Sequence, residues 1–361
     1  MLRTYALAGC LLCSAAAIAQ QKMDFEKYDP VSTLKVPEHP LSRAKFPFVD
    51  VHNHQWNMGS ASLGNLTSAM DKLNMRVMVN LSGGSGSGLK AMTDNIKASA
   101  PKRFLVFHNI NFNGIGEEGW TAKAVAQLEQ DVREGAGGLK VFKNLGLSVK
   151  DNKGNRVKVD DPRLDAIWAK CGELKIPVLI HTADPKPFWD PVDEHNERWL
   201  EIVTHPGRKR GPNDPAPWET LIAEQHRMFK KHPKTTFIDA HFGWYANDLA
   251  KLSQLMDDMP NIVVEFGAVI AELGRQPKMA RAFFEKYQDR ILFGKDSWVP
   301  EEYATYFRVL ETGDEYFPYH KKYHAFWRMY GLNLPDNILK KVYYKNALRI
   351  LPKIDKTQFP D

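Results

Sequence analysis

The sequence predicts an α/β protein with the architecture of a TIM-type (β/α)8 barrel. Three observations support this fold class. The 361 residues are 43% hydrophobic and 25% charged, an ordinary globular composition that excludes disordered, fibrous and coiled-coil proteins. The length exceeds that of most single domains but suits one large barrel. Eight short apolar runs alternate with amphipathic segments, as repeated βα units require.

The eight runs have continuous apolar character, which is typical of parallel strands covered on both faces. They occupy residues 47–52, 76–81, 104–108, 138–142, 177–181, 236–241, 262–266 and 291–296. The segments between them have helical periodicity, with Ala124, Leu128 and Val132 on one stripe of 121–134 and Ile167 and Cys171 on one stripe of 162–174. In such a barrel, catalytic groups are expected just after the carboxyl ends of the strands.

The N-terminus is typical of an exported protein. Residues 1–19 are apolar after Arg3 and end in Ala17-Ile18-Ala19, which predicts a cleaved signal peptide and a periplasmic or secreted location. The alternative is a lipid anchor on Cys10, within Leu7-Ala8-Gly9-Cys10. No transmembrane segment remains after cleavage, and Cys171 is then the only cysteine, so no disulfide framework is expected.

The remaining chain divides into three parts by composition. Residues 20–45 form a polar N-terminal arm, residues 46–352 the barrel and residues 353–361 a C-terminal tail. Within the barrel, 184–217 is an insertion loop that carries seven of the 22 prolines, and its length suits a lid or pocket wall. Residues 298–330 hold 11 of the 40 aromatic residues. We expect a packed helical cap there, with a ring-binding platform as the alternative.

Histidines and a carboxylate follow the predicted strands. His52 and His54 are two residues apart, so both side chains project from the same side of the first strand. His181, His241 and Asp296 end the fifth, sixth and eighth strands. Three imidazoles and one carboxylate suit one divalent metal; zinc is expected, with Mn, Co and Fe as alternatives.

These motifs resemble the amidohydrolase superfamily, specifically its amidohydrolase-related (amidohydrolase 2) branch. The resemblance covers residues 46–352 and rests on the five segments Asp50-x-His52-x-His54, Val178-Leu-Ile-His181, Asp239-Ala-His241-Phe-Gly243, Leu292-Phe-Gly-Lys-Asp296-Ser297 and Tyr344-Lys-Asn346-Ala347. It implies that His52, His54, His181 and Asp296 bind the metal. It also implies catalytic roles for His241, which would hold or polarise water or substrate, and for Asp296, which would transfer a proton.

The resemblance implies a hydrolase that uses metal-activated water on an ester, lactone or amide carbonyl of a small organic molecule. The second hypothesis is a metal-dependent, non-oxidative decarboxylase of an aromatic or unsaturated carboxylic acid. The third, from another class, is a non-catalytic ligand-binding barrel. The expected partner is a small molecule, carboxylated or aromatic, and a homo-oligomer is left open.

Four further residues are candidates for the site. The segment around Lys140 resembles the place where binuclear relatives carry a carbamylated lysine, which implies a bridge to a second metal as an alternative to the single-metal site. Lys140 could instead bind a substrate carboxylate or form a salt bridge with Glu265. His108, Arg208 and Trp298 are candidates for substrate binding.

Two classes of ligand are not expected. No nucleotide or other organic cofactor is expected, because the glycine-rich loop 82–88 matches neither phosphate-binding motif. Nucleic acid is not expected either, because Arg208-Lys209-Arg210 is the only tight basic cluster in a chain of net charge +6.

Overall fold

The computed structural model describes residues 23–24, 27–324 and 326–360, and the signal peptide and Cys10 considered above lie outside these residues. Residues 1–34 and 35–361 form two separate units. In the first unit, residues 28–34 have no regular secondary structure. None of the helices within the described residues has the length and apolar character needed to cross a bilayer.

The second unit confirms the predicted barrel. Its main sheet has eight parallel strands in chain order, each hydrogen-bonded to the next. The strands are β1 (Phe48–Asn53), β2 (Met75–Asn80), β3 (Phe104–Asn109), β4 (Gly138–Val141), β5 (Val178–Ile180), β6 (Phe237–Asp239), β7 (Ile262–Glu265) and β8 (Ile291–Leu292). The amide of Val51 donates to the carbonyl of Phe293 at 2.9 Å, which joins β1 to the segment after β8.

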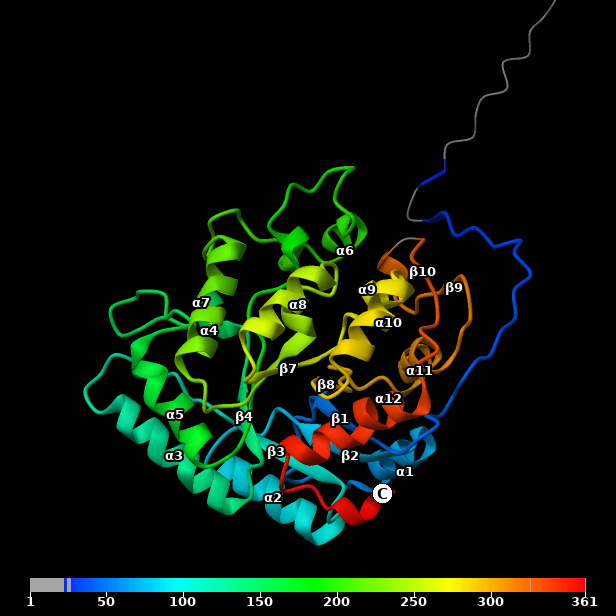
Figure 1. Cartoon of the computed structure of the whole chain (residues 1–361). Helices are drawn as coiled ribbons and strands as arrows, with labels where there is room; N and C mark the ends of the chain where they lie inside the picture. The colour runs from blue at the N-terminus through cyan, green and yellow to red at the C-terminus, as the bar shows by residue number, and fades with distance from the viewer. Residues whose placement is uncertain (1–22, 25–26, 325, 361) are drawn as a thin grey trace, which may run out of the picture. The chain divides into compact units, whose positions relative to one another are not determined.

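Helices surround the strands, as Figure 1 shows for the unit 35–361. They are α1 (Gly64–Leu73), α2 (Ser87–Ser99), α3 (Trp120–Glu134), α4 (Asn144–Leu147), α5 (Asp165–Glu173), α6 (Trp199–Thr204), α7 (Trp218–Lys231), α8 (Leu249–Asp258), α9 (Ile270–Gly274), α10 (Pro277–Lys286), α11 (Tyr303–Glu311), α12 (Asp336–Lys340) and α13 (Asn346–Ile350). The amphipathic stripe of 121–134 accordingly lies on α3, where Leu128 is fully buried.

Apolar side chains fill the space between strands and helices. All residues of β1, β4, β5, β6 and β7 are buried, which explains why these strands are continuous apolar runs in the sequence. Aromatic rings contribute to this core; the Phe48 and Phe293 centroids, for example, are 4.7 Å apart. The polar groups at the strand ends therefore rest on a rigid, close-packed support.

The long connection after β5 has its own small hydrophobic core. Its elements are two short 3-10 turns, Lys186–Phe188 and Pro206–Arg208, and helix α6. Phe188, Trp189 and Ile202 pack here against residues of α7. Residues 298–330 contain helix α11 and the antiparallel pair β9 (Phe317–Pro318) and β10 (Arg328–Met329).

Candidate metal centre

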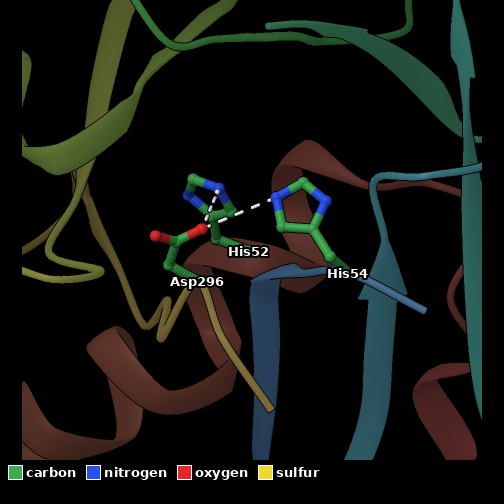
Figure 2. A group of neighbouring side chains, drawn as sticks. All are labelled: His52, His54 and Asp296. Atoms are coloured by element: carbon green, nitrogen blue, oxygen red, sulfur yellow. Dashed lines mark ion pairs between the residues drawn. The ribbon is translucent and has the colours of Figure 1, made fainter. Parts of the chain in front are cut away.

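The two histidines of the first strand approach Asp296 at the barrel mouth. His52 is fully buried in β1, and its Nε2 lies 3.3 Å from Oδ1 of Asp296. His54 follows the strand, and its Nε2 lies 3.5 Å from the same oxygen. Figure 2 shows both imidazoles turned toward this carboxylate. The period-two spacing thus brings both rings to one point, as their positions on the strand require.

The backbone places Asp296 in an uncommon conformation. Asp296 has a φ of 81°, in the left-handed region that non-glycine residues rarely adopt. Its amide donates to the carbonyl of His52 at 2.6 Å, which ties the segment after β8 to β1. Burial acts to raise the pKa of Asp296, but the neighbouring His52 and His54 outweigh burial and hold that pKa well below its usual value.

Glu265, at the end of β7, orients His52. Its Oε1 lies 2.8 Å from His52 Nδ1 and accepts the amide of His241 at 2.9 Å. Its Oε2 accepts the amide of Gly267 at 2.7 Å. Burial acts to raise the pKa of Glu265, but His52 and these hydrogen bonds dominate and lower it to about 2. An ionised acceptor at Nδ1 requires a proton there and leaves the Nε2 lone pair of His52 facing the cluster, a common arrangement for metal-binding histidines.

This orienting role of Glu265 was not predicted from the sequence. The only signal was a single carboxylate in the otherwise apolar run 262–266. A charge that is fully buried needs a partner, but the run does not reveal which strand supplies that partner.

His241 and His181 are linked directly. Nδ1 of His241 lies 2.7 Å from the carbonyl oxygen of Gly267, which can only accept a hydrogen bond, so Nδ1 carries a proton. His241 Nε2 then accepts from His181 Nδ1 at 3.2 Å. In this tautomer His181 Nε2 has a lone pair, and it is buried without a hydrogen-bond partner among the described residues. Burial and neighbouring positive charge hold the pKa of His181 well below its usual value, so the ring is neutral.

The five predicted residues form overlapping groups. The ligand atoms of His52, His54 and Asp296 all lie within 4.8 Å of one another, and those of His52, His241 and Glu265 also lie within 4.8 Å of one another. His181 is not part of either three-residue group and is linked to them through His241, whose ring centroid is 5.0 Å from that of His52. Two imidazole nitrogens, a carboxylate oxygen and a buried, unpartnered imidazole nitrogen form a donor set that fits a divalent transition metal.

Lys140 lies beside this cluster. It is 1% exposed, and its Nζ is 3.5 Å from Nε2 of His52. Burial lowers its pKa to about 8, against the opposing charges of Asp296 and Glu265. Lys140 and Glu265 do not form an ion pair in the part of the chain that the structure describes; Glu265 pairs with His52 instead. The salt-bridge role considered for Lys140 is thus wrong, because the Glu265 carboxylate pairs with the imidazole of His52.

The three remaining candidates have other immediate neighbours. His108 Nδ1 pairs with Asp131 of α3 at 2.6 Å, on the helix side of the sheet. Arg208 pairs with Glu201 of α6. Trp298 contacts the Tyr303 ring edge-on, with centroids 5.7 Å apart.

Two tryptophans flank the histidines, and the sequence motifs had not indicated them. Trp56 is 67% exposed and stacks on His54, with centroids 5.9 Å apart and planes 13° from parallel. Phe142, after β4, lies 5.5 Å from His54 and 6.3 Å from Trp56. Trp244 stacks on His241 at 4.5 Å. The barrel mouth thus has an exposed, flat aromatic surface directly beside the candidate metal ligands.

Comparisons with known proteins agree with the barrel fold. A family model described as amidohydrolase matches residues 96–353. No curated protein matches the chain. Among solved structures, a 2,6-dihydroxybenzoate decarboxylase in complex with 2,6-dihydroxybenzoate is similar, at 16% identity and a TM-score of 0.53, covering 85% of this chain and 99% of that one.

Two further structures have the same fold at low identity. A dihydroxybenzoic acid decarboxylase from a Polaromonas species, with bound manganese and the inhibitor 2-nitroresorcinol, is 13% identical, with 87% and 99% coverage of this chain and that chain and a TM-score of 0.54. A 4-oxalomesaconate hydratase from Rhodopseudomonas palustris is 12% identical, with 86% and 97% coverage and a TM-score of 0.51.

Proposed function

Since the chain belongs to the amidohydrolase family, whose model matches residues 96–353, we propose that it is a metal-dependent hydrolase of an ester, lactone or amide carbonyl in a small organic molecule. The family supports a metal-dependent enzyme of hydrolase or lyase type, and the proposal narrows this to attack by water. The metal is proposed to be a single zinc ion, held by His52, His54, His181 and Asp296.

The observation that carries the proposal is the position of the Asp296 carboxylate. Oδ1 faces His52 and His54, while the other oxygen points away from both rings (Figure 2). The side chain as a whole is 35% exposed, so the carboxylate is not sealed from solvent. An ionised carboxylate accepts a proton, as the general base in hydrolysis must.

A divalent metal at this site would polarise a carbonyl and lower the pKa of a bound water from about 15.7 to about 7. The protein's own groups would complete the chemistry. Asp296 would take the proton of the attacking water and pass it to the leaving group. His241, whose Nδ1 donates to the Gly267 carbonyl, has an acceptor at Nε2 that would orient the N–H of His181 or the O–H of the attacking water. Buried strands on all sides would hold these groups in place.

A second candidate is a non-oxidative decarboxylase of an aromatic or unsaturated acid. The aromatic surface of Trp56 and Phe142 favours it, because a planar substrate could stack there beside His54. Lys140, buried next to His52, could hold a carboxylate or be carbamylated. The decarboxylases among the structures of similar fold are consistent with this candidate.

One experiment separates these candidates. The mature protein, residues 20–361, is purified without chelator, its metal content is measured, and it is assayed in parallel for acid release from esters, lactones and amides and for CO2 release from aromatic acids. Acid release that is lost in Asp296→Asn supports the hydrolase. CO2 release alone supports the decarboxylase, and neither activity in a metal-loaded protein supports the ligand-binding barrel.

Export is also part of the proposal. It rests on the apolar character of residues 1–19. Expression of the full chain in a bacterial host, followed by N-terminal sequencing of the periplasmic fraction, tests it: a mature N-terminus at Gln20 supports cleavage, and lipid on Cys10 supports the anchored alternative.

A further inference from the structure

The three basic residues of the 208–210 cluster have different environments, although they are equivalent in the sequence. Arg208 pairs with Glu201 of α6. The ammonium of Lys209 donates to the carbonyls of Phe188, Asp190 and Arg210 at 2.8–3.1 Å, so its role is to fix the loop. Arg210 alone turns toward the strand ends, where its Nη2 binds Oδ2 of Asp184 at 2.9 Å.

Asp184 holds two cations at once. It is 4% exposed and lies three residues after His181. Its Oδ2 binds Arg210, and its Oδ1 binds Nζ of Lys143 at 2.5 Å. The main-chain oxygen of Asp184 accepts from Trp218 Nε1 at 2.9 Å, which fixes the residue further. One carboxylate therefore orients two positive charges, and a net charge of about +1 remains for a ligand.

These cations lie at the carboxyl ends of β4 and β5, the edge at which barrel enzymes bind substrate. Lys143 follows Phe142, whose ring is 5.5 Å from His54. Its side chain is 42% exposed and that of Arg210 is 25% exposed, so both are partly accessible to solvent. Lys143 is thus close to the candidate metal centre, and Arg210 is joined to Lys143 through Asp184.

The guanidinium of Arg210 is only partly used, since Nη2 binds Asp184 and Nη1 makes a long hydrogen bond of 3.4 Å to the Gly207 carbonyl. Its Nε is buried and has no hydrogen-bond partner among the described residues. A buried donor without an acceptor costs roughly 1–3 kcal/mol, more when the group is charged. The fork of an arginine, unlike a lysine ammonium, can bind both oxygens of one carboxylate. The Arg210 side chain as a whole is 25% exposed, so a ligand carboxylate could bind the exposed part of the guanidinium while Asp184 holds Nη2.

We infer that Arg210 and Lys143, held by Asp184, form an anion subsite that recognises a second carboxylate of the substrate, separate from the group that reacts at the metal centre. This inference rests on the proposed function, because it assigns the substrate class of the same site: a small molecule with a reactive carbonyl or carboxyl group and an additional carboxylate. Arg210 is the specificity-determining residue. It binds the second carboxylate of the substrate and takes no part in the reaction.

Binding measurements test the subsite without requiring turnover. The metal-loaded protein is titrated calorimetrically with phthalate, isophthalate and terephthalate, and with the monoamide of each acid. Each pair has nearly the same shape and differs by one negative charge. The wild-type protein is expected to bind the dicarboxylate of at least one spacing tenfold or more tightly than its monoamide. Arg210→Gln should reduce that preference below threefold.

Arg208→Gln is the matched control, since it removes an equal charge two residues away and should keep the preference. Lys143→Gln, at a more exposed side chain, should reduce the preference partially and provides a second test if Arg210→Gln folds poorly. Three outcomes overturn the inference: no preference at any spacing in the wild-type protein, a preference unchanged in both Arg210→Gln and Lys143→Gln, or an equal loss in Arg208→Gln. Failure of the proposed hydrolysis would instead appear as normal binding preference without acid release.

Discussion

Nε2 of His241 lies 3.2 Å from Nδ1 of His181, and this hydrogen bond determines which nitrogen of His181 is available to a metal. The carbonyl of Gly267 sets the tautomer of His241, and His241 in turn sets that of His181. The two histidines are 60 residues apart in the chain but act as one unit. Because His181 offers a nitrogen to the metal and His241 orients His181, substitutions of the two residues should have different effects.

His181→Ala should lose metal and activity together, because it removes a nitrogen that is buried and has no partner within the described residues. His241→Ala should retain more metal than His181→Ala, because it removes only the acceptor that orients His181, and should lose catalytic rate by roughly 100-fold or more when the metal is saturating. Elemental analysis and turnover of both variants check this. Full activity in metal-free His181→Ala would contradict the ligand assignment.

Glu265→Gln should weaken metal binding by roughly 10- to 100-fold, the usual effect of removing a group that orients a metal-binding histidine. The amide keeps the size of the side chain but loses the charge that holds a proton on His52 Nδ1. Competition with a chelator measures the change. Glu224→Gln is the control, because Glu224 is equally buried but pairs with Arg156 and the amide of Val159; equal weakening in both variants would argue against a specific role for Glu265.

Gly294→Ala should disturb the contact between Glu265 and His52, because it adds a methyl group to the backbone beside both side chains. A Cβ at this position would lie 2.1 Å from Glu265 Oε2 and 3.0 Å from the Cβ of His52, so both side chains would have to shift. We expect a stability loss of about 1–3 kcal/mol, typical of overpacking, together with reduced metal affinity. Urea denaturation and chelator competition measure these effects.

Gly88→Ala is the comparison for Gly294→Ala. Position 88 lies in α2 with nothing within 4 Å of the added Cβ, so stability should rise by about 0.5–1 kcal/mol through helix propensity. Metal affinity that is unchanged in Gly294→Ala would show that the contact between Glu265 and His52 tolerates displacement.

The pH dependence of stability should include a contribution from His226 of α7. Burial, with the charges of Lys230 and Lys251, lowers its pKa from 6.5 to about 4. Between these values the unfolded chain binds a proton that the folded chain does not bind, so stability is complete above pH 6.5 and falls as the pH drops toward 4. The loss is no more than about 3 kcal/mol, since His226 is only partly buried.

Urea unfolding at pH 7.5 and pH 5 checks this contribution. His226→Gln should decrease the difference in unfolding free energy between the two pH values. His195→Gln should not, because the His195 side chain is 85% exposed. The same difference in the wild-type protein and in His226→Gln would assign the pH dependence to other groups.

The sequence was sufficient to predict the barrel and to place the candidate metal ligands near the ends of its strands. Strands buried on both faces must be apolar throughout, so the eight strands appear as eight apolar runs, and their ends are marked by His52, His181, His241 and Asp296. Parallel strands bring those ends to one edge of the barrel. The alternation of side chains along β1 explains why His52 and His54 could be predicted to act together.

Other features depend on contacts between distant parts of the chain and leave no local pattern. Glu265 orients His52 from 213 residues away, and within 208–210 only Arg210 reaches Asp184. The sequence shows which residues can ionise and on which face of a strand they lie. It does not show which partner a buried charge selects, because that choice depends on distances that exist only after β1, β7 and the loop after β5 have packed together.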